Sequence, residues 1–170
     1  ARGRLDFARL LTSAGFDHKQ PSKEGWTPLH AAATQRDLSV FKYFLERGDL
    51  NSRWRQLDQR AMKEIETTKA DTQKVYFSSR TPFHIAAANG HTELVRYLLS
   101  LEIAFEILDV PTETGETPLN NAAYWHRYRT VELLLNVMSD PNAKTSVSWG
   151  PGYTALHHAL AVYDSQRASA

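Results

Sequence analysis

The sequence contains no cysteine, which excludes disulfide bonds, cysteine-ligated zinc and thiol catalysis together. Its formal net charge is only +1, and no run of five like charges occurs. It therefore lacks the excess of Lys and Arg that attracts nucleic acid or an anionic membrane surface. No stretch approaches the roughly 18 consecutive apolar residues of a membrane-spanning helix. We expect a soluble chain, cytoplasmic or nuclear, that is not inserted in a membrane.

Motifs that carry common enzyme chemistry are missing as well. The sequence has no His-Glu-x-x-His, Gly-x-x-x-x-Gly-Lys, Gly-x-Gly-x-x-Gly or Gly-x-Ser-x-Gly pattern. Seven histidines are present, and His157 and His158 are adjacent. Adjacent residues on a helix point about 100° apart, so this pair cannot easily share a metal ion. We expect no enzyme activity, no cofactor and no metal site.

The sequence does contain one short motif, which is present in four copies. The equivalent threonines of the four copies are 54, 36 and 37 residues apart. A run of small residues follows each copy, and such runs let neighbouring helices approach closely. Near-regular periods of this length indicate a repeat array, which presents an extended surface and no enclosed pocket by construction. The copies are Gly25-Trp-Thr-Pro-Leu-His30, Arg80-Thr-Pro-Phe-His84, Gly115-Glu-Thr-Pro-Leu-Asn120 and Gly152-Tyr-Thr-Ala-Leu-His157.

Each full repeat is predicted to form two helices. In three copies a Thr precedes a Pro, which is favoured at the first position of a helix, and the Thr hydroxyl can cap the free N–H groups there. A second stretch in each repeat has apolar residues at helical spacing. These second stretches contain Val40, Phe41, Phe44 and Leu45; Leu94, Val95, Leu98 and Leu99; and Val131, Leu134 and Leu135.

These residues resemble the ankyrin-repeat family, whose motif Gly-x-Thr-Pro-Leu-His-x-Ala-Ala is followed by a Gly-His turn and a Leu-Leu-Leu helix end. The segment from Thr81 to Leu99 reproduces most of that unit in order. The resemblance implies an all-α solenoid of stacked helix-turn-helix pairs, with projecting loops or β-hairpin fingers and a concave face that binds proteins. It also implies that His30, His84 and His157 bond backbone in neighbouring turns. The third repeat has His126-Arg127 in place of Gly-His, and Asn120 in place of His, which puts its turn geometry and its local hydrogen bonds in doubt.

We expect a single ankyrin-repeat domain over residues 1–170, cut from a longer array. It opens with the second helix of a partial repeat and closes with the first helix of another. The insertion at 55–79 is interpreted either as a surface insertion packed on its own array or as a projecting finger that contacts a partner. The expected segments are a partial repeat (1–20), a repeat (21–54), the insertion (55–79), repeats at 80–113 and 114–146, and a partial repeat (147–170).

The family register also indicates which residues point outward and are free to bind. Exposed Trp and Tyr bury a large area at little cost in side-chain entropy, so they dominate interface hot spots. We expect an aromatic patch of Tyr124, Trp125 and Tyr153, and its predicted charged rim is Arg80, Arg127 and Glu116. The alternative is that Trp26 and Trp125 fill gaps in the core. The expected partner-binding residues are Trp26, Thr34, Gln35, Arg80, Asn89, Glu116, Tyr124, Trp125, Trp149 and Tyr153.

The function expected from this pattern is a non-catalytic protein-interaction module, a regulatory or scaffolding region of a larger protein. Two alternatives stay open: binding of a nucleotide or single-stranded nucleic acid by aromatic stacking, and a structural spacer in a longer array. Asn142, in Asp140-Pro-Asn142, resembles the site that asparaginyl hydroxylases modify in ankyrin repeats, and otherwise is a turn residue. We expect a monomer unless the truncated ends associate, and a partner that the sequence does not identify.

Overall fold

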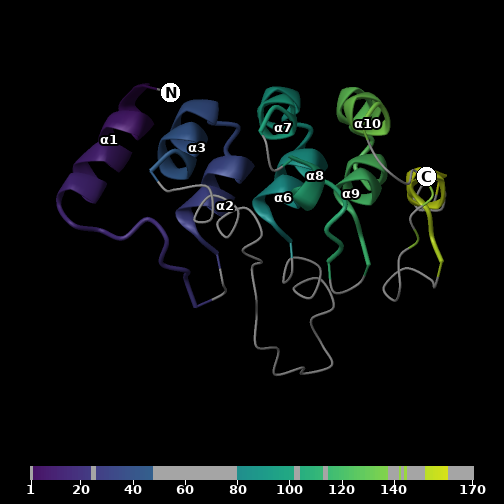
Figure 1. Cartoon of the computed structure of the whole chain (residues 1–170), viewed down its shortest axis with the longest axis horizontal. Helices are drawn as coiled ribbons and strands as arrows, with labels where there is room; N and C mark the ends of the chain where they lie inside the picture. Colours follow the sequence, from purple (N-terminus) through teal and green to yellow (C-terminus); the bar gives the residue numbers. More distant parts are fainter. Residues whose placement is uncertain are drawn as a thin grey trace, which may run out of the picture. The chain divides into compact units, whose positions relative to one another are not determined.

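The computed structural model describes residues 2–23, 26–47, 80–101, 104–112, 115–137, 142, 144 and 152–160. The chain divides into two compact units, unit 1 (Ala1–Pro82) and unit 2 (Phe83–Ala170). All regular structure within the described residues is α-helical, which confirms the all-α fold class. The insertion expected at 55–79 lies outside the described residues. Figure 1 labels the helices.

Unit 1 holds three helices: α1 (Arg2–Ser13), α2 (Pro28–Thr34) and α3 (Leu38–Leu45). α3 packs against both α1 and α2. Its apolar side chains form the core of the unit, and Phe41 and Leu45 are fully buried. Ala32 and Ala33 on α2 are also buried, and their small size lets the two helices of the repeat approach closely.

Unit 2 contains α6 (Pro82–Asn89, whose first residue closes unit 1), α7 (Thr92–Leu99), α8 (Ala104–Ile107), α9 (Pro118–Tyr124) and α10 (Tyr128–Leu135). Residues 155–160 form a further helix. α10 packs against α9 and against α7. The core is built from fully buried side chains of each helix pair, namely Phe83, Leu94, Leu98, Leu119 and Leu134. The short helix α8 was not predicted; it packs against α7 and buries Ile107.

The recurring Thr-Pro phrase is a helix start, as predicted. Pro28 and Pro118 occupy the first turns of α2 and α9. At α9 the Thr117 hydroxyl accepts a hydrogen bond from the backbone N–H of Asn120 at 3.3 Å. At α2 the imidazole of His30 takes part, because its Nδ1 accepts from the backbone N–H of Thr27 at 3.2 Å. Both arrangements satisfy N–H groups that a helix start leaves free.

The turn between the two helices of each repeat keeps one geometry with three different residues. The left-handed position is Gly90 in the second repeat (φ 70°), but Arg36 in the first (φ 56°) and His126 in the third (φ 54°). The third turn, whose geometry was in doubt from the sequence, therefore has the same left-handed backbone as the turn at Gly90. The same substitution in the first repeat, Arg36, was not foreseen.

The chain segments before α2 and α9 are each held by a reciprocal pair of hydrogen bonds. In unit 1 the N–H of Ser22 donates to the carbonyl of Trp26 at 2.8 Å, and the N–H of Trp26 donates to the Ser22 hydroxyl at 3.2 Å. In unit 2 Thr112 and Glu116 form the same pair, at 2.9 and 3.0 Å. Trp26 and Glu116, which precede the N-cap residues of α2 and α9, are thus fixed in place by these bonds.

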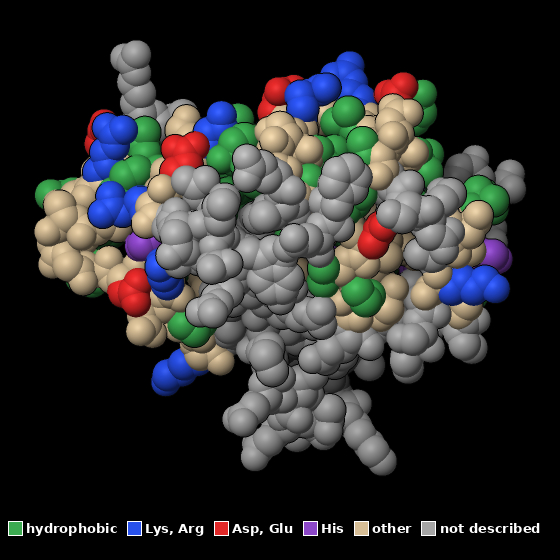
Figure 2. All heavy atoms as spheres, viewed as in Figure 1, with side chains coloured by type: hydrophobic (Ala, Val, Ile, Leu, Met, Phe, Trp, Pro, Cys, Tyr) green, Lys and Arg blue, Asp and Glu red, His purple; other side chains and the backbone are tan. Residues whose placement is uncertain are grey.

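The solvent face of the outer helices in unit 2 is charged. Glu93 and Arg96 on α7, and Arg129 and Glu132 on α10, are all exposed. Figure 2 shows charged side chains gathered over these helices. No helix among the described residues is long and apolar enough to cross a membrane.

Candidate functional site

Three aromatic side chains of unit 2 form the surface that we call the aromatic face: Tyr124, Trp125 and Tyr153. Tyr124 ends α9 and is half-buried, and Trp125 follows it as the C-cap residue with 45% of its side chain exposed. Their ring centroids lie 5.2 Å apart with an interplanar angle of 85°, an edge-to-face contact. Trp125 is therefore a surface residue and does not fill a gap in the core.

Tyr153 joins this face through two histidines of the following helix. Its ring stacks on His157 at 5.4 Å between centroids and meets His158 edge-on at 5.9 Å. His158 also meets Tyr124 edge-on, at 6.2 Å. Tyr124 and Tyr153 come from consecutive repeats, so the structure brings them to the same imidazole, as the repeat register predicts.

His158 is buried, with 2% exposure, and its Nε2 has no hydrogen-bond partner among the described residues. Burial lowers its pKa below the usual value; the negative charge of Glu116 opposes this shift, and His157 adds to it. The ring is therefore held in its neutral form. At the same repeat position in α9, the Asn121 amide donates to the Thr117 carbonyl at 3.2 Å and to the Glu116 carboxylate at 3.4 Å. Buried polar groups thus adjoin the aromatic rings.

The predicted charged rim is wrong at two of its three residues, whereas Arg127 is exposed. Arg80 and Glu116 are buried, with 7% and 6% exposure. The backbone at this position is held by a hydrogen bond that links successive repeats: His30 Nε2 lies 3.2 Å from the Arg80 carbonyl, and His84 Nε2 lies 3.0 Å from the Glu116 carbonyl. Because His30 Nδ1 accepts from Thr27, Nε2 carries the proton and donates. This position is therefore pinned against the preceding repeat.

Arg127 was also expected at the rim, and it has a structural contact. Its Nε donates to the Ala88 carbonyl at 2.8 Å, across to the end of α6. Its side chain also lies directly against the Gly90 turn.

The other predicted residues are spread over the chain. Asn89 is exposed in unit 2. In unit 1 Thr34 and Gln35 are exposed, and the Gln35 side chain accepts a hydrogen bond from Arg4 at 3.2 Å. Trp26 is half-buried against the ring of His30, at 5.6 Å between centroids.

Two further predicted positions lie in the last part of the chain. Trp149 falls outside the described residues. Asn142 is an exposed turn residue, and its immediate neighbours are not described.

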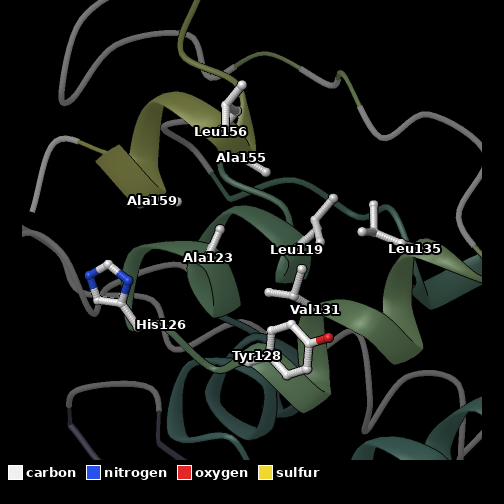
Figure 3. A pocket seen from close by; sticks show the side chains of 9 residues that line it. All are labelled: Leu119, Ala123, His126, Tyr128, Val131, Leu135, Ala155, Leu156 and Ala159. Carbon is white, nitrogen blue, oxygen red and sulfur yellow. The ribbon is translucent and has the colours of Figure 1, made fainter.

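Unit 2 also has an apolar groove that sequence reasoning missed. It has a volume of about 390 Å³ and lies between α9, α10 and the helix at 155–160 (Figure 3). Leu135 and Leu156 at its edge are 50% and 67% exposed. From the sequence, Leu135 was predicted only as one of the apolar residues at helical spacing in this helix. The groove is lined by Leu119, Ala123, His126, Tyr128, Val131, Leu135, Ala155, Leu156 and Ala159.

The described residues hold no group of three or more His, Asp or Glu side chains that could bind a metal ion. The sequence has no common catalytic motif, and the site provides an apolar groove and the exposed edges of aromatic rings. These properties are suited to binding another molecule.

Comparison with known proteins agrees with this description. Residues 56–145 match a family model described as ankyrin repeats (3 copies), and residues 1–45 match one described as ankyrin repeats (many copies). The probable 26S proteasome regulatory subunit p28 of Saccharomyces cerevisiae is 27% identical over 83% of this chain and 51% of its own length. The nuclear factor NF-kappa-B p105 subunit of Gallus gallus is 28% identical over 73% of this chain and 12% of its own length.

A putative palmitoyltransferase, ZDHHC13 of Danio rerio, is 29% identical over 71% of this chain but only 20% of its own length. The chain thus spans about half or less of these relatives, and the last match carries no argument for enzyme activity here. Ankyrin repeats are generally non-catalytic modules that bind other proteins. From its repeated motif, its paired helices and these matches, the chain belongs to the ankyrin-repeat family.

Proposed function

We propose that this chain binds a partner protein through the aromatic face of unit 2, as a non-catalytic module. The observation that carries the proposal is the exposure of Trp125 beside the edge-on ring of Tyr124. Trp and Tyr provide most of the binding energy at protein interfaces when they lie near the centre of the contact. The side chains of Arg80 and Glu116 do not shield these rings from a partner, because both are buried.

The contacts among these rings favour binding further. Tyr124 and Tyr153 are both held against the buried ring of His158, so their rotamers are restricted before any partner arrives. A surface that is ordered in advance loses less side-chain entropy on association. The aromatic face therefore has large area and low ordering cost.

The charges around the face favour a protein over a nucleotide or nucleic acid. Arg127 is engaged with the Ala88 carbonyl, and Arg80 is buried. A nucleic-acid site needs several free cations along the ligand backbone, and its affinity falls steeply with salt. Burial of aromatic area depends little on salt, so partner binding should persist in high salt.

We place the module inside the cell, in the cytoplasm or the nucleus, as a regulatory or scaffolding region of a larger protein. A chain without cysteine forms no disulfide bonds and therefore needs no oxidising compartment. A regulatory role agrees with the name of one relative, a probable proteasome regulatory subunit. Exposure of Asn142 leaves it available as a hydroxylation site, which mass spectrometry of the protein from cells would detect.

The test is a crosslinking pull-down from cell extract with three forms of the chain. These are the wild type, the Tyr124→Ala/Trp125→Ala variant, and the control Phe16→Ala, which removes an exposed aromatic ring of unit 1. Circular dichroism first establishes that all three are folded. We expect a protein captured by the wild type and the control but lost with the double variant. Equal capture by all three forms, or by none, contradicts the proposal.

A further inference from the structure

The rings of the aromatic face present negative charge density to a partner. An aromatic ring is negative over its two faces and positive at its edge. The planes of Tyr124 and Trp125 meet at 85°, so one of the two rings contributes only its edge to the contact. That ring keeps both of its faces clear of its neighbour, and Trp125 is 45% exposed. The surface is therefore suited to a positive charge placed over a ring.

Polar groups beneath the rings add to this negative potential. The imidazole of His158 contacts both Tyr124 and Tyr153. Burial lowers the pKa of that imidazole, and the nearby carboxylate of Glu116 opposes the shift, so the negative charge of the carboxylate reaches the base of the face. The buried Oδ1 atom of Asn121 has no hydrogen-bond donor among the described residues, which leaves the partial negative charge of this oxygen uncompensated.

The cationic side chains described in unit 2 do not neutralise this potential. Two of them lie on the outer helices α7 and α10, whereas Tyr124 ends the inner helix α9. Arg127 is engaged with a carbonyl at the end of α6, and Lys144 is exposed beside Gly152. Within the part of unit 2 that the structure describes, no Lys or Arg lies over the ring of Trp125 or Tyr153. These cations are Arg96, Arg127, Arg129 and Lys144.

We propose that the aromatic face receives an arginine side chain of the partner protein, an inference that rests on the proposed function. The guanidinium group is planar, always charged and weakly hydrated, so it stacks on an aromatic ring at a lower desolvation cost than the ammonium group of lysine. Trp gives the strongest cation–π contact of the aromatic residues, so the guanidinium lies over Trp125 beside Tyr124. A neutral or acidic side chain gains nothing from the ring potential or from Glu116.

Titration of the full 170-residue chain with capped tripeptides tests this proposal. The first peptide is Gly-Arg-Gly, and the second carries citrulline, which has the shape of arginine without its charge. Two-dimensional NMR at constant ionic strength follows the indole N–H signal of Trp125, which is assigned as the signal absent from Trp125→Phe. We expect a saturable shift with the arginine peptide and about tenfold weaker binding of the citrulline peptide. Gly-Lys-Gly should also bind more weakly than Gly-Arg-Gly.

Two variants show which groups attract the arginine. Trp125→Leu keeps an apolar side chain but removes the aromatic ring, so the arginine peptide should no longer shift the backbone amide signals of Tyr124 and Tyr153. Glu116→Gln removes the negative charge at nearly the same side-chain size, so the affinity for the arginine peptide should fall about threefold. The control Phe16→Ala should bind as the wild type does. Circular dichroism establishes folding, and Trp125→Leu decides the outcome if the buried Glu116→Gln variant does not fold.

The result can contradict this proposal without contradicting the proposed function. No shift at Trp125 with the arginine peptide, equal binding of the citrulline or lysine peptide, or unchanged binding by Trp125→Leu would overturn the arginine contact. A protein that is captured by the wild type and lost with Tyr124→Ala/Trp125→Ala would still support the proposed function in each of these cases. Arginine binding without capture of any protein would support the contact and contradict only the proposed function.

Discussion

Asn120 stands where His30 and His84 link their repeats to the next. Each of these histidines reaches a backbone carbonyl of the following repeat, and His30 also bonds Thr27 of its own repeat. The Asn120 side chain is shorter. Its Oδ1 accepts from the Thr117 hydroxyl, while its buried Nδ2 has no hydrogen-bond partner among the described residues. The third repeat therefore lacks a link that the first two have, and the carbonyl equivalent in register is that of Tyr153.

Replacing Asn120 with His should restore this link. We expect Asn120→His to raise the free energy of unfolding by about 1 kcal/mol, the net value of a hydrogen bond plus relief of a buried unpaired amide. Urea denaturation measures the change. Asn120→Leu is the matched control, since it removes the amide but cannot reach the carbonyl. A gain from His no larger than that from Leu would show that the link does not form.

His158 should make the stability of unit 2 depend on pH. Burial lowers its pKa in the folded state, so the unfolded chain binds a proton at higher pH than the folded chain does. No effect is expected well above pH 6.5; as the pH falls below that value, stability should be lost until the folded ring also titrates. His18 in unit 1 has its pKa lowered mainly by burial as well, so part of the loss should belong to that residue.

Urea denaturation at pH 7.5 and pH 5 separates these contributions. We expect His158→Leu to lose less stability between the two pH values than the wild type. His157→Gln, which removes only the smallest cause of the shift, should keep most of the dependence of the wild type. An unaltered dependence in His158→Leu would rule out His158 as its source.

At the scale of elements, the sequence predicts the helices well because their starts have local causes. Pro fixes the backbone of the first helical turn and Thr caps it, and these residues recur at Thr27 and Thr117. The turns were harder to predict, since Arg36 carries no turn signal and its left-handed conformation comes from the repeat around it. The short helix α8 has four residues, too few to show a periodic pattern.

Part of the candidate site could be predicted from the sequence, because the repeat determines which residues lie at equivalent positions. Register predicts that Tyr124 and Tyr153 are neighbours, because the repeat fixes which positions align, and both rings do contact His158. It could not show that Arg80 and Glu116 are buried, since side-chain exposure depends on the neighbours from other repeats. The groove was missed because the pattern marks Leu135 as apolar but cannot show that nothing covers it.

The shared turn geometry leads to opposite predictions for two residues. Arg36→Gly should stabilise the chain by about 1 kcal/mol, because a left-handed backbone is costly for a residue with a Cβ atom. Gly90→Ala should destabilise it by about 1 to 2 kcal/mol: φ is 70°, and the new Cβ would lie 2.8 Å from Cδ of Arg127, which must shift. Thermal unfolding of both variants measures the two changes in stability. If both variants gained stability, or both lost it, the two turns would not share a requirement for left-handed backbone.

At the scale of the whole molecule, unit 2 carries two surfaces with different chemistry. The aromatic face has ordered rings next to buried polar groups, and the groove has exposed leucines on two helices. Their residues do not overlap. Both are surfaces that a repeat array displays without enclosing a pocket.

The most direct test of the central claim compares binding and stability for Trp125→Ala, using the protein captured by the wild-type chain. A hot-spot residue should lose roughly 2 kcal/mol of binding free energy, about a thirtyfold rise in Kd. Its free energy of unfolding should fall by less than about 1 kcal/mol, because the side chain is 45% exposed. An unchanged Kd, or a loss of about 3 to 5 kcal/mol in unfolding free energy as for a core aromatic residue, would contradict the account.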